Sequence, residues 1–217
     1  MPNRYTDQQK YFEQAYTTGS DIWTHFPYET KAAELLEKLP QNSIILDLGS
    51  GRGTWAFELV EKGYRAIGID YAKRAVDKAN ADAAVRNLAS KVRFVEGDVL
   101  DMAFKDSTFD AAADFGLLQH LHPEDWERYA AEVARTIKPG GYFLLVGFSK
   151  ETPAWLGFNP KAAATGGFEK YGIHYYFFAK EEIAKIFEKY FEIVEQKNET
   201  LSTPNTPVFL STLFKKK

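Results

Sequence analysis

Short runs of apolar residues recur along the first 150 residues, separated by segments with helical spacing. The run from Ile44 to Leu48 is nearly all apolar, and three glycines at alternate positions follow it before a helical pattern at 54–62. A short apolar run of this kind is typical of a buried strand in a parallel sheet. The same reasoning predicts further strands at 64–70, 92–96, 109–115 and 142–148, and helices at 72–87 and 123–136.

The C-terminal quarter of the chain carries a different pattern. A helix is predicted at 180–190, followed by strands at 192–196 and 208–214. The connection 198–207 between these strands is polar and rich in turn-forming residues. We therefore expect the two strands to pair antiparallel at one edge of the sheet.

No helical or strand period is visible in 149–179, where aromatic residues, glycines and prolines are concentrated. Loops of this length in a compact domain are usually functional or disordered, and the many aromatic side chains argue against disorder. We expect this segment to be a lid over a substrate. Residues 1–26 include a helical pattern at 6–18 and are expected to form an arm over the same substrate. A second, amphipathic helix is predicted at 27–39, beginning at a proline.

The composition is that of one folded domain. The chain has 217 residues, of which 45% are hydrophobic and 15% aromatic, so residues 1–217 are expected to share one fold. A formal charge of −3 argues against a nucleic-acid partner, which usually needs a basic face. There are no cysteines, and no apolar run is long enough for a membrane span. We expect a cytoplasmic protein with no nucleic-acid or membrane partner, either a monomer or a homodimer.

The glycine-rich turn after the first strand indicates a ligand that lies against bare main chain. Glycines allow the tight turn and the close approach, and the N–H groups of the helix start face the ligand. Asp70 closes the second strand, where it is placed to accept hydrogen bonds from ribose hydroxyls. The segment Gly51-x-Gly53-x-x-Ala56 also fits a dinucleotide-binding pattern, but Asp47 inside the strand does not belong to that pattern. A nicotinamide-dependent oxidoreductase therefore stays as an alternative only.

The segment Asp47-x-Gly49-x-Gly51-x-Gly53 resembles motif I of the class I S-adenosylmethionine-dependent methyltransferases of the type 11/25 group. Four further segments resemble later strands of that family in the same order, namely Gly68–Asp70, Val92–Val99, Phe109–Leu121 and Ala134–Val146. The resemblance covers 40–148 and implies an α/β enzyme with a Rossmann-like, doubly wound, mostly parallel seven-stranded sheet and a C-terminal antiparallel hairpin. It also implies S-adenosylmethionine as cofactor and S-adenosylhomocysteine as product.

The same resemblance implies which residues hold the cofactor. The three glycines of motif I would admit its methionine and ribose portions, and Asp47 would orient its amino group. For Asp47 the alternative is a capping acid for the glycine turn, and for Asp98 it is a turn residue. The implied cofactor residues are Asp47, Gly49, Gly51 and Gly53 in motif I, Asp70 and Tyr71 at the ribose, Asp98 and Val99 at the adenine, and Asp114 and Phe115 at the methionine end.

Candidate acceptor-binding residues follow the fourth strand and lie in the expected lid. Gln119 and His120 come where open α/β sheets bind ligands, and His120 could take a proton from the acceptor or simply pack under the lid. His174 in the lid is a second candidate base. The four histidines are too scattered along the sequence to predict a metal site. The aromatic residues expected to wall the acceptor pocket are Tyr16, Trp23, Phe148, Trp155, Phe158 and Tyr175.

A looser resemblance bears on the class of acceptor. Tyr11–Tyr16 with Asp21–Trp23 resembles the N-terminal arm of the thiopurine, thiol and tellurite methyltransferase group, and Asp114–Leu121 is similar to its segment after the fourth strand. The chain departs from that group at Phe115, where the group often has arginine, and at Gln119, where it often has histidine.

The expected acceptor is a small, partly hydrophobic molecule. An aromatic pocket with few bases suits a thiol or other soft atom, which needs positioning more than proton removal. A hydroxyl or amine acceptor is the alternative, and it would need His120 or His174 as base. A non-catalytic module that only binds S-adenosylmethionine is a further alternative.

Overall fold

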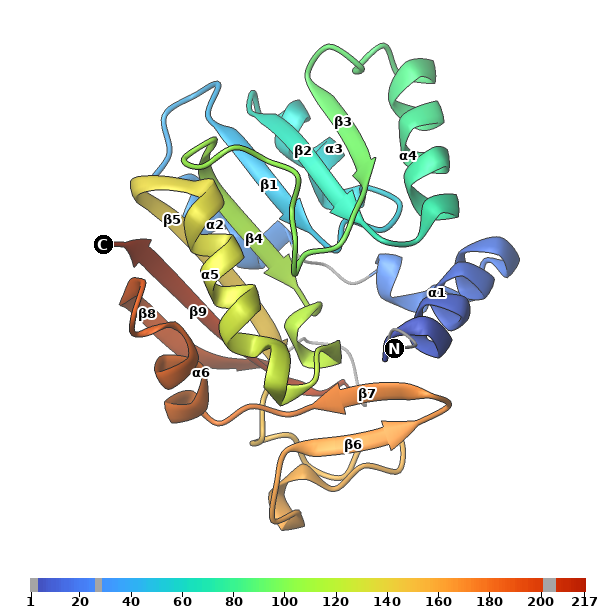
Figure 1. Ribbon diagram of the computed structural model, residues 1–217, viewed down its shortest axis with the longest axis vertical. Helices are drawn as coiled ribbons and strands as arrows, with labels where there is room; N and C mark the ends of the chain where they lie inside the picture. Colours follow the sequence, from blue (N-terminus) through green and yellow to red (C-terminus); the bar gives the residue numbers. More distant parts are fainter. Residues whose placement is uncertain (1–3, 26–28, 201–205) are drawn as a thin grey trace.

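A computed structural model of the chain describes residues 4–25, 29–200 and 206–217. Within these residues, seven strands form one sheet in the order β3-β2-β1-β4-β5-β9-β8 (Figure 1). Strands β3 to β5 in this order are parallel, whereas β9 is antiparallel to both of its neighbours. The strands are β1 (Ile44–Leu48), β2 (Arg65–Asp70), β3 (Val92–Glu96), β4 (Phe109–Phe115), β5 (Ile137–Phe148), β8 (Phe191–Thr200) and β9 (Val208–Lys216).

Helices cover both faces of this sheet, because its central strands bury side chains on both sides. Along β1, Leu46 and Leu48 pack into one apolar core and Ile45 into the other. This arrangement confirms the doubly wound, mostly parallel sheet and its C-terminal antiparallel hairpin. No helix among the described residues combines the length and the apolar character needed to cross a membrane. The helices are α5 (Trp126–Thr136) and α6 (Lys180–Phe187) over the first core, and α2 (Glu29–Leu36), α3 (Thr54–Glu61) and α4 (Lys73–Val85) over the second.

Several boundaries differ from those expected. Strand β5 begins at Ile137 rather than at residue 142, because Ile137 already pairs with Phe109 before the register shifts at an irregularity. The segment that was expected only to end helix α5 therefore forms the irregular first part of β5. Strand β8 is longer than expected and reaches Thr200. The proline start expected for the helix at 27–39 lies outside the described residues, as does most of the connection between β8 and β9.

The expected lid contains regular structure that its sequence did not predict. Strands β6 (Gly167–Lys170) and β7 (Ile173–Tyr176) pair antiparallel, joined by Tyr171 and Gly172 with φ of 58° and 74°. Positive φ at both positions is the geometry of a type I′ turn, which fits the twist of a hairpin. The β6–β7 hairpin extends from one end of the fold toward α1 (Thr6–Thr18), and α1 contacts β7 (Figure 1). Its function as a lid stays a prediction.

Candidate active site

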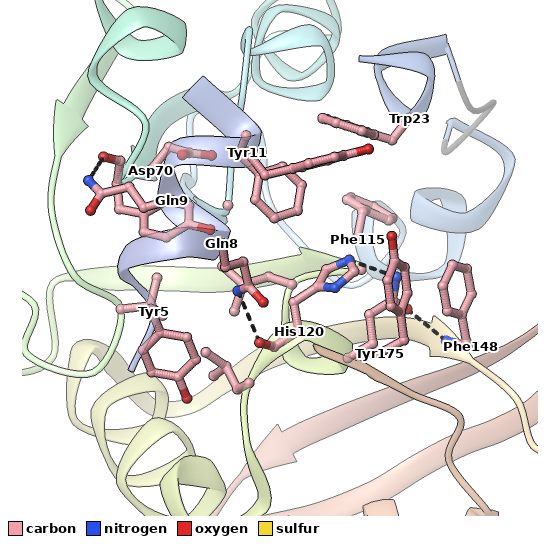
Figure 2. A pocket seen from close by; sticks show the side chains of 18 of the residues that line it. Tyr5, Gln8, Gln9, Tyr11, Trp23, Asp70, Phe115, His120, Phe148 and Tyr175 are labelled. Carbon is pink, nitrogen blue, oxygen red and sulfur yellow. Dashed lines mark hydrogen bonds between the residues drawn. The ribbon is translucent and has the colours of Figure 1, made fainter. Parts of the chain in front are cut away.

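A cavity of about 610 Å³ opens at the carboxyl ends of β1 to β4, between α1 and the β6–β7 hairpin (Figure 2). This is the edge at which open α/β sheets bind ligands, and the volume suits a drug-sized molecule. Most of the site residues expected from the sequence line this cavity. The expected residues that do not line it are Asp47, Gly51, Gly53, Asp114 and His174.

The three glycines of the turn after β1 differ in what they face. Gly49 lines the cavity with φ of +70°, a conformation that favours glycine. At Gly51, the space where a Cβ would lie is filled by the hydroxyl of Tyr16. At Gly53, an added Cβ would meet the ring of Phe94 in β3. Gly53 therefore allows helix α3 to pack closely on the sheet, and the structure does not bring it to the ligand space.

Asp70 and Asp98 lie on the cavity wall at the ends of β2 and β3. The Asp70 carboxylate accepts hydrogen bonds from the backbone N–H groups of Gly51 and Ala72, each at 2.8 Å. Burial raises the pKa of Asp70 to about 6. Asp98 is exposed and accepts from the backbone N–H of Leu100 at 2.8 Å, which is the turn geometry considered as its alternative role. Both carboxylates therefore combine a local backbone contact with a place on the wall.

Asp47 and Asp114 are buried in the sheet and do not line the cavity. Burial, followed by the charges of Asp70 and Asp114, raises the pKa of Asp47 to about 8. Burial also raises the pKa of Asp114 to about 6, and its carboxylate accepts from the N–H of Leu117 at 2.6 Å and the hydroxyl of Tyr129 at 2.8 Å. Asp114 thus stabilises the turn after β4. Carboxylates this close together make the neighbouring cavity favourable for a cation.

His120 ends the short 3₁₀ helix η2 (Leu118–His120), and its imidazole lies in the cavity wall (Figure 2). Its Nδ1 lies 2.7 Å from the carbonyl oxygen of His174. A carbonyl only accepts, so Nδ1 carries the proton and Nε2 carries the lone pair. Burial lowers the pKa of His120 to about 4, which keeps the ring neutral at pH 7. The amide nitrogen of Gln119 lies 3.5 Å from this Nε2, and its amide oxygen accepts from the N–H of Phe148.

His174, the second candidate base, turns its side chain away from the cavity. Its ring stacks on that of His122 with centroids 4.4 Å apart, and its Nδ1 lies 2.6 Å from the Glu169 carboxylate. Its contribution to the site is the backbone carbonyl that orients His120. The fold also brings ligand atoms of His122, Glu169 and His174 within 4.8 Å of one another, although their scattered positions in the sequence predicted no metal site.

Gln8 in α1 connects the parts of this site, and the sequence analysis did not select it. Its buried side chain donates to the carbonyl of His120 at 3.1 Å and accepts from the N–H of His174 at 3.2 Å (Figure 2). Gln8 therefore links the arm, the turn after β4 and the hairpin. In the sequence it is one glutamine in a polar stretch, and nothing local separates it from Gln9 or Gln14.

The half of the cavity around His120 has aromatic walls. The His120 ring meets Phe12 and Tyr175 edge-on, with centroids 5.5 and 5.0 Å apart. Lys170, also missed in the sequence, lines this half with its ammonium 5.2 Å from the ring centre of Phe158. The six aromatic residues expected for this wall all line the cavity, namely Tyr16, Trp23, Phe148, Trp155, Phe158 and Tyr175.

Replacing Gln8 with alanine should raise the pKa of His120 from about 4 toward its ordinary value near 6.5. The substitution loosens α1 from the turn after β4 and admits water, and burial is the main cause of the low pKa. Titration of the histidine ring resonances by NMR measures this directly. Gln14→Ala, on an exposed face of the same helix, is the matched control and should leave the midpoint unchanged. An unmoved midpoint in Gln8→Ala would show that α1 does not shield His120.

Comparison with known sequences identifies the same central segment. Residues 45–141 match a family described as a methyltransferase domain. The chain is 35% identical over 125 residues to the demethylmenaquinone methyltransferase of Thermus thermophilus. The aligned segment covers 56% of this chain and 54% of that protein. Across several curated relatives, the chain spans between 26% and 56% of their length.

Solved structures share the fold over most of the chain. The 1,6-didemethyltoxoflavin-N1-methyltransferase of Burkholderia thailandensis, with bound 1,6-didemethyltoxoflavin and S-adenosylhomocysteine, superposes with a TM-score of 0.82 at 23% identity and covers 100% of this chain and 91% of that chain. A protein from Methanosarcina mazei, described as an S-adenosylmethionine-dependent methyltransferase, superposes with a TM-score of 0.74 at 26% identity and covers 85% and 97%. The motif segments, the family match and this fold agree: residues 45–141 are similar to a methyltransferase domain, and the chain has the fold of S-adenosylmethionine-dependent methyltransferases, whose cofactor is S-adenosylmethionine.

Proposed function

We propose that this chain transfers the methyl group of S-adenosylmethionine to a nitrogen or oxygen atom of a small, flat, largely apolar acceptor, with His120 as the base. The observation that carries the proposal is the hydrogen bond from His120 Nδ1 to the carbonyl of His174. This bond leaves a lone pair on Nε2 of a neutral imidazole in the cavity wall. A neutral imidazole nitrogen in the wall can take the proton that a weakly nucleophilic N–H or O–H group must lose.

The charge beside the cavity supports a cationic cofactor. S-adenosylmethionine carries a sulfonium and an ammonium, whereas a nicotinamide dinucleotide carries an anionic pyrophosphate. The carboxylates of Asp70 and Asp114, with pKa values of about 6, are charged at neutral pH, and they attract the first and repel the second. The N–H of Gly51 is also bonded to Asp70 and so is not presented to a phosphate. A nicotinamide-dependent oxidoreductase is therefore disfavoured.

The aromatic walls support a planar acceptor. Phe12 and Tyr175 flank the His120 ring, so a flat molecule can pack against aromatic surface within reach of Nε2. The Burkholderia thailandensis structure is that of an N1-methyltransferase and holds 1,6-didemethyltoxoflavin. Relatives are named for demethylmenaquinone and for sterols. We infer an acceptor with a ring system and few charges, smaller than a macromolecule.

The position of His120 shifts our preference away from the thiol acceptor expected from the sequence. That expectation rested on an apolar pocket with few bases, and the wall of this cavity holds a neutral imidazole. A thiol is kept as the second candidate, because the aromatic walls around Trp155 and Phe158 would also suit a soft atom that needs no base.

In this proposal the chain acts by positioning and by one proton transfer. Asp70 holds the ribose hydroxyls and Asp98 the adenine amino group. When bound, S-adenosylmethionine supplies an electrophilic methyl group. Nε2 of His120 would take the proton that the acceptor atom loses as it accepts the methyl group. Helix α1 and the β6–β7 hairpin exclude water during transfer.

Heating the protein with candidate ligands tests the cofactor assignment. S-adenosylhomocysteine at about 100 times its Kd should add about 2.7 kcal/mol of stability, since a ligand that binds only the folded state stabilises it. For a domain of this size that corresponds to a rise in Tm of roughly 5–10 °C. NAD at the same concentration should leave Tm unchanged. A larger rise with NAD would overturn the assignment.

Methyl transfer itself separates an enzyme from a module that only binds the cofactor. A panel of nitrogen, oxygen and thiol ring compounds, assayed with radiolabelled S-adenosylmethionine, should show turnover for at least one nitrogen or oxygen acceptor. The intact cavity, with Gln119 and His120 held by specific hydrogen bonds, supports catalysis. Cofactor binding without turnover across a broad panel would favour the non-catalytic alternative.

A further inference from the structure

A cluster of three possible metal ligands lies outside the methyl-transfer cavity. His122 follows the turn after β4, whereas Glu169 and His174 are cross-strand partners in the β6–β7 hairpin. One ligand atom from each lies within 4.8 Å of the others. None of the three residues lines the cavity. The cluster therefore joins two segments that are far apart in the sequence and is not used by the methyl-transfer site.

The imidazole of His174 is the fixed member of this cluster. It is buried, and its Nδ1 lies 2.6 Å from the Glu169 carboxylate. A carboxylate accepts, so Nδ1 carries the proton and the lone pair lies on Nε2. Within the described part of the chain this buried Nε2 has no hydrogen-bond partner. A buried polar atom without a partner calls for an explanation, and an ion is one that fits an imidazole lone pair.

The other two members can adjust to a ligand. His122 is half-buried and stacks on His174 with ring centroids 4.4 Å apart, so a turn of its ring brings a second nitrogen to the same place. Glu169 is exposed at its outer end and orients His174, as carboxylates orient metal-bound histidines.

We propose that Nε2 of His174 and a ring nitrogen of His122 bind one divalent transition-metal ion such as Zn²⁺, with Glu169 orienting His174 through Nδ1. Two imidazoles are donors that suit Zn²⁺, Ni²⁺ or Cu²⁺ and are poor for Mg²⁺ or Ca²⁺. Water completes the coordination, because the cluster offers two ring nitrogens. The ion would fasten the β6–β7 hairpin to the segment after β4, and so hold the carbonyl of His174 in place against His120.

Metal titration tests this site. The full chain, prepared without a histidine tag and stripped with chelator, should bind one Zn²⁺ in a competition assay with a chelating dye. His122→Ala and His174→Ala should each weaken binding roughly tenfold or more, and Glu169→Gln by about tenfold. Glu181→Gln, which removes an exposed glutamate from α6, is the matched control and should bind as the unmodified chain does.

Further measurements keep the result decisive. Because His174 is buried, thermal unfolding checks that the His174→Ala variant folds. If that variant does not fold, the His122→Ala variant tests the proposal in its place. Cu²⁺ bound to the chain should show nitrogen coupling in its electron paramagnetic resonance spectrum, and less of it in His122→Ala. Zn²⁺ should also slow proteolysis within 149–179 in the unmodified chain alone. Absence of binding, or binding that is the same in His122→Ala, overturns the proposal.

Discussion

His120→Ala should lower kcat for a nitrogen or oxygen acceptor by about 10²–10⁴-fold, the usual contribution of a positioned general base. The substitution removes Nε2 of His120. This ring nitrogen keeps its lone pair, because Nδ1 carries the proton and donates to the carbonyl of His174. The Kd for S-adenosylhomocysteine should stay the same, because the cofactor is expected at the ends of β1 to β3. Single-turnover rates for the two proteins, with calorimetry for the cofactor, measure both quantities.

The pH dependence of the reaction gives a second measure of the same role. In the proposed function the active form of His120 is the neutral one, and the pKa of His120 lies at about 4. At saturating S-adenosylmethionine, the value of kcat/KM for the acceptor should therefore be flat across neutral pH and fall only as the pH drops through about 4. A matched pair of hydroxyl and thiol acceptors separates the candidate functions. Thiol turnover that survives the substitution, together with a hydroxyl compound that never reacts, would restore the soft acceptor expected from the sequence.

Asp70→Ala should weaken S-adenosylmethionine binding by about one to two decades, because it removes the proposed charge-assisted hydrogen bonds to the ribose, worth about 1.5–3 kcal/mol. The folded-state pKa of Asp70 is raised to about 6, above its ordinary value near 3.9, so its charge lowers the stability of the ligand-free protein at neutral pH. In Asp70→Ala, removal of this destabilising charge offsets the loss of the two backbone hydrogen bonds that Asp70 accepts. Thermal unfolding should consequently change little.

Calorimetric titration with S-adenosylhomocysteine measures the affinity. Asp77→Ala is a suitable control, because Asp77 is an exposed carboxylate on α4 that pairs with Lys73 and does not line the cavity. It should bind the cofactor as the unmodified chain does. Equal affinities for the Asp70 and Asp77 variants would mean that the end of β2 does not hold the ribose.

The parallel sheet was predictable from the sequence because its signals are local. Each buried strand is a short apolar run, and Asp47, Asp70 and Asp98 mark the ends where the strands open. The β6–β7 hairpin was missed because its strands have four residues each, and its turn depends on a positive φ at Tyr171, which no composition rule indicates. Aromatic residues in this segment signalled order, but they did not indicate which residues pair.

Site residues were predictable where a backbone position alone decides the role, and less so where side-chain direction decides it. Asp114 lies at the expected strand end, yet its carboxylate turns inward to Tyr129. His174 lies in the expected lid, yet alternation along β7 turns its ring away from the cavity. Gln8 acquires its role only from two segments more than 100 residues away. Such contacts arise from tertiary packing, which a single sequence does not encode locally.

The hydrogen bonds between the N-terminal arm and the glycine turn after β1 have a kinetic consequence. Arg52, inside that turn, donates two hydrogen bonds to Asp21, at 2.6 and 2.9 Å, and one to the carbonyl of Tyr16. We expect the arm fastened there to impose an order in which S-adenosylmethionine binds before the acceptor and S-adenosylhomocysteine leaves after the methylated product. S-adenosylhomocysteine should therefore inhibit competitively against S-adenosylmethionine and noncompetitively against the acceptor. Random-order kinetics would mean that the arm allows the two substrates to enter the cavity independently of each other.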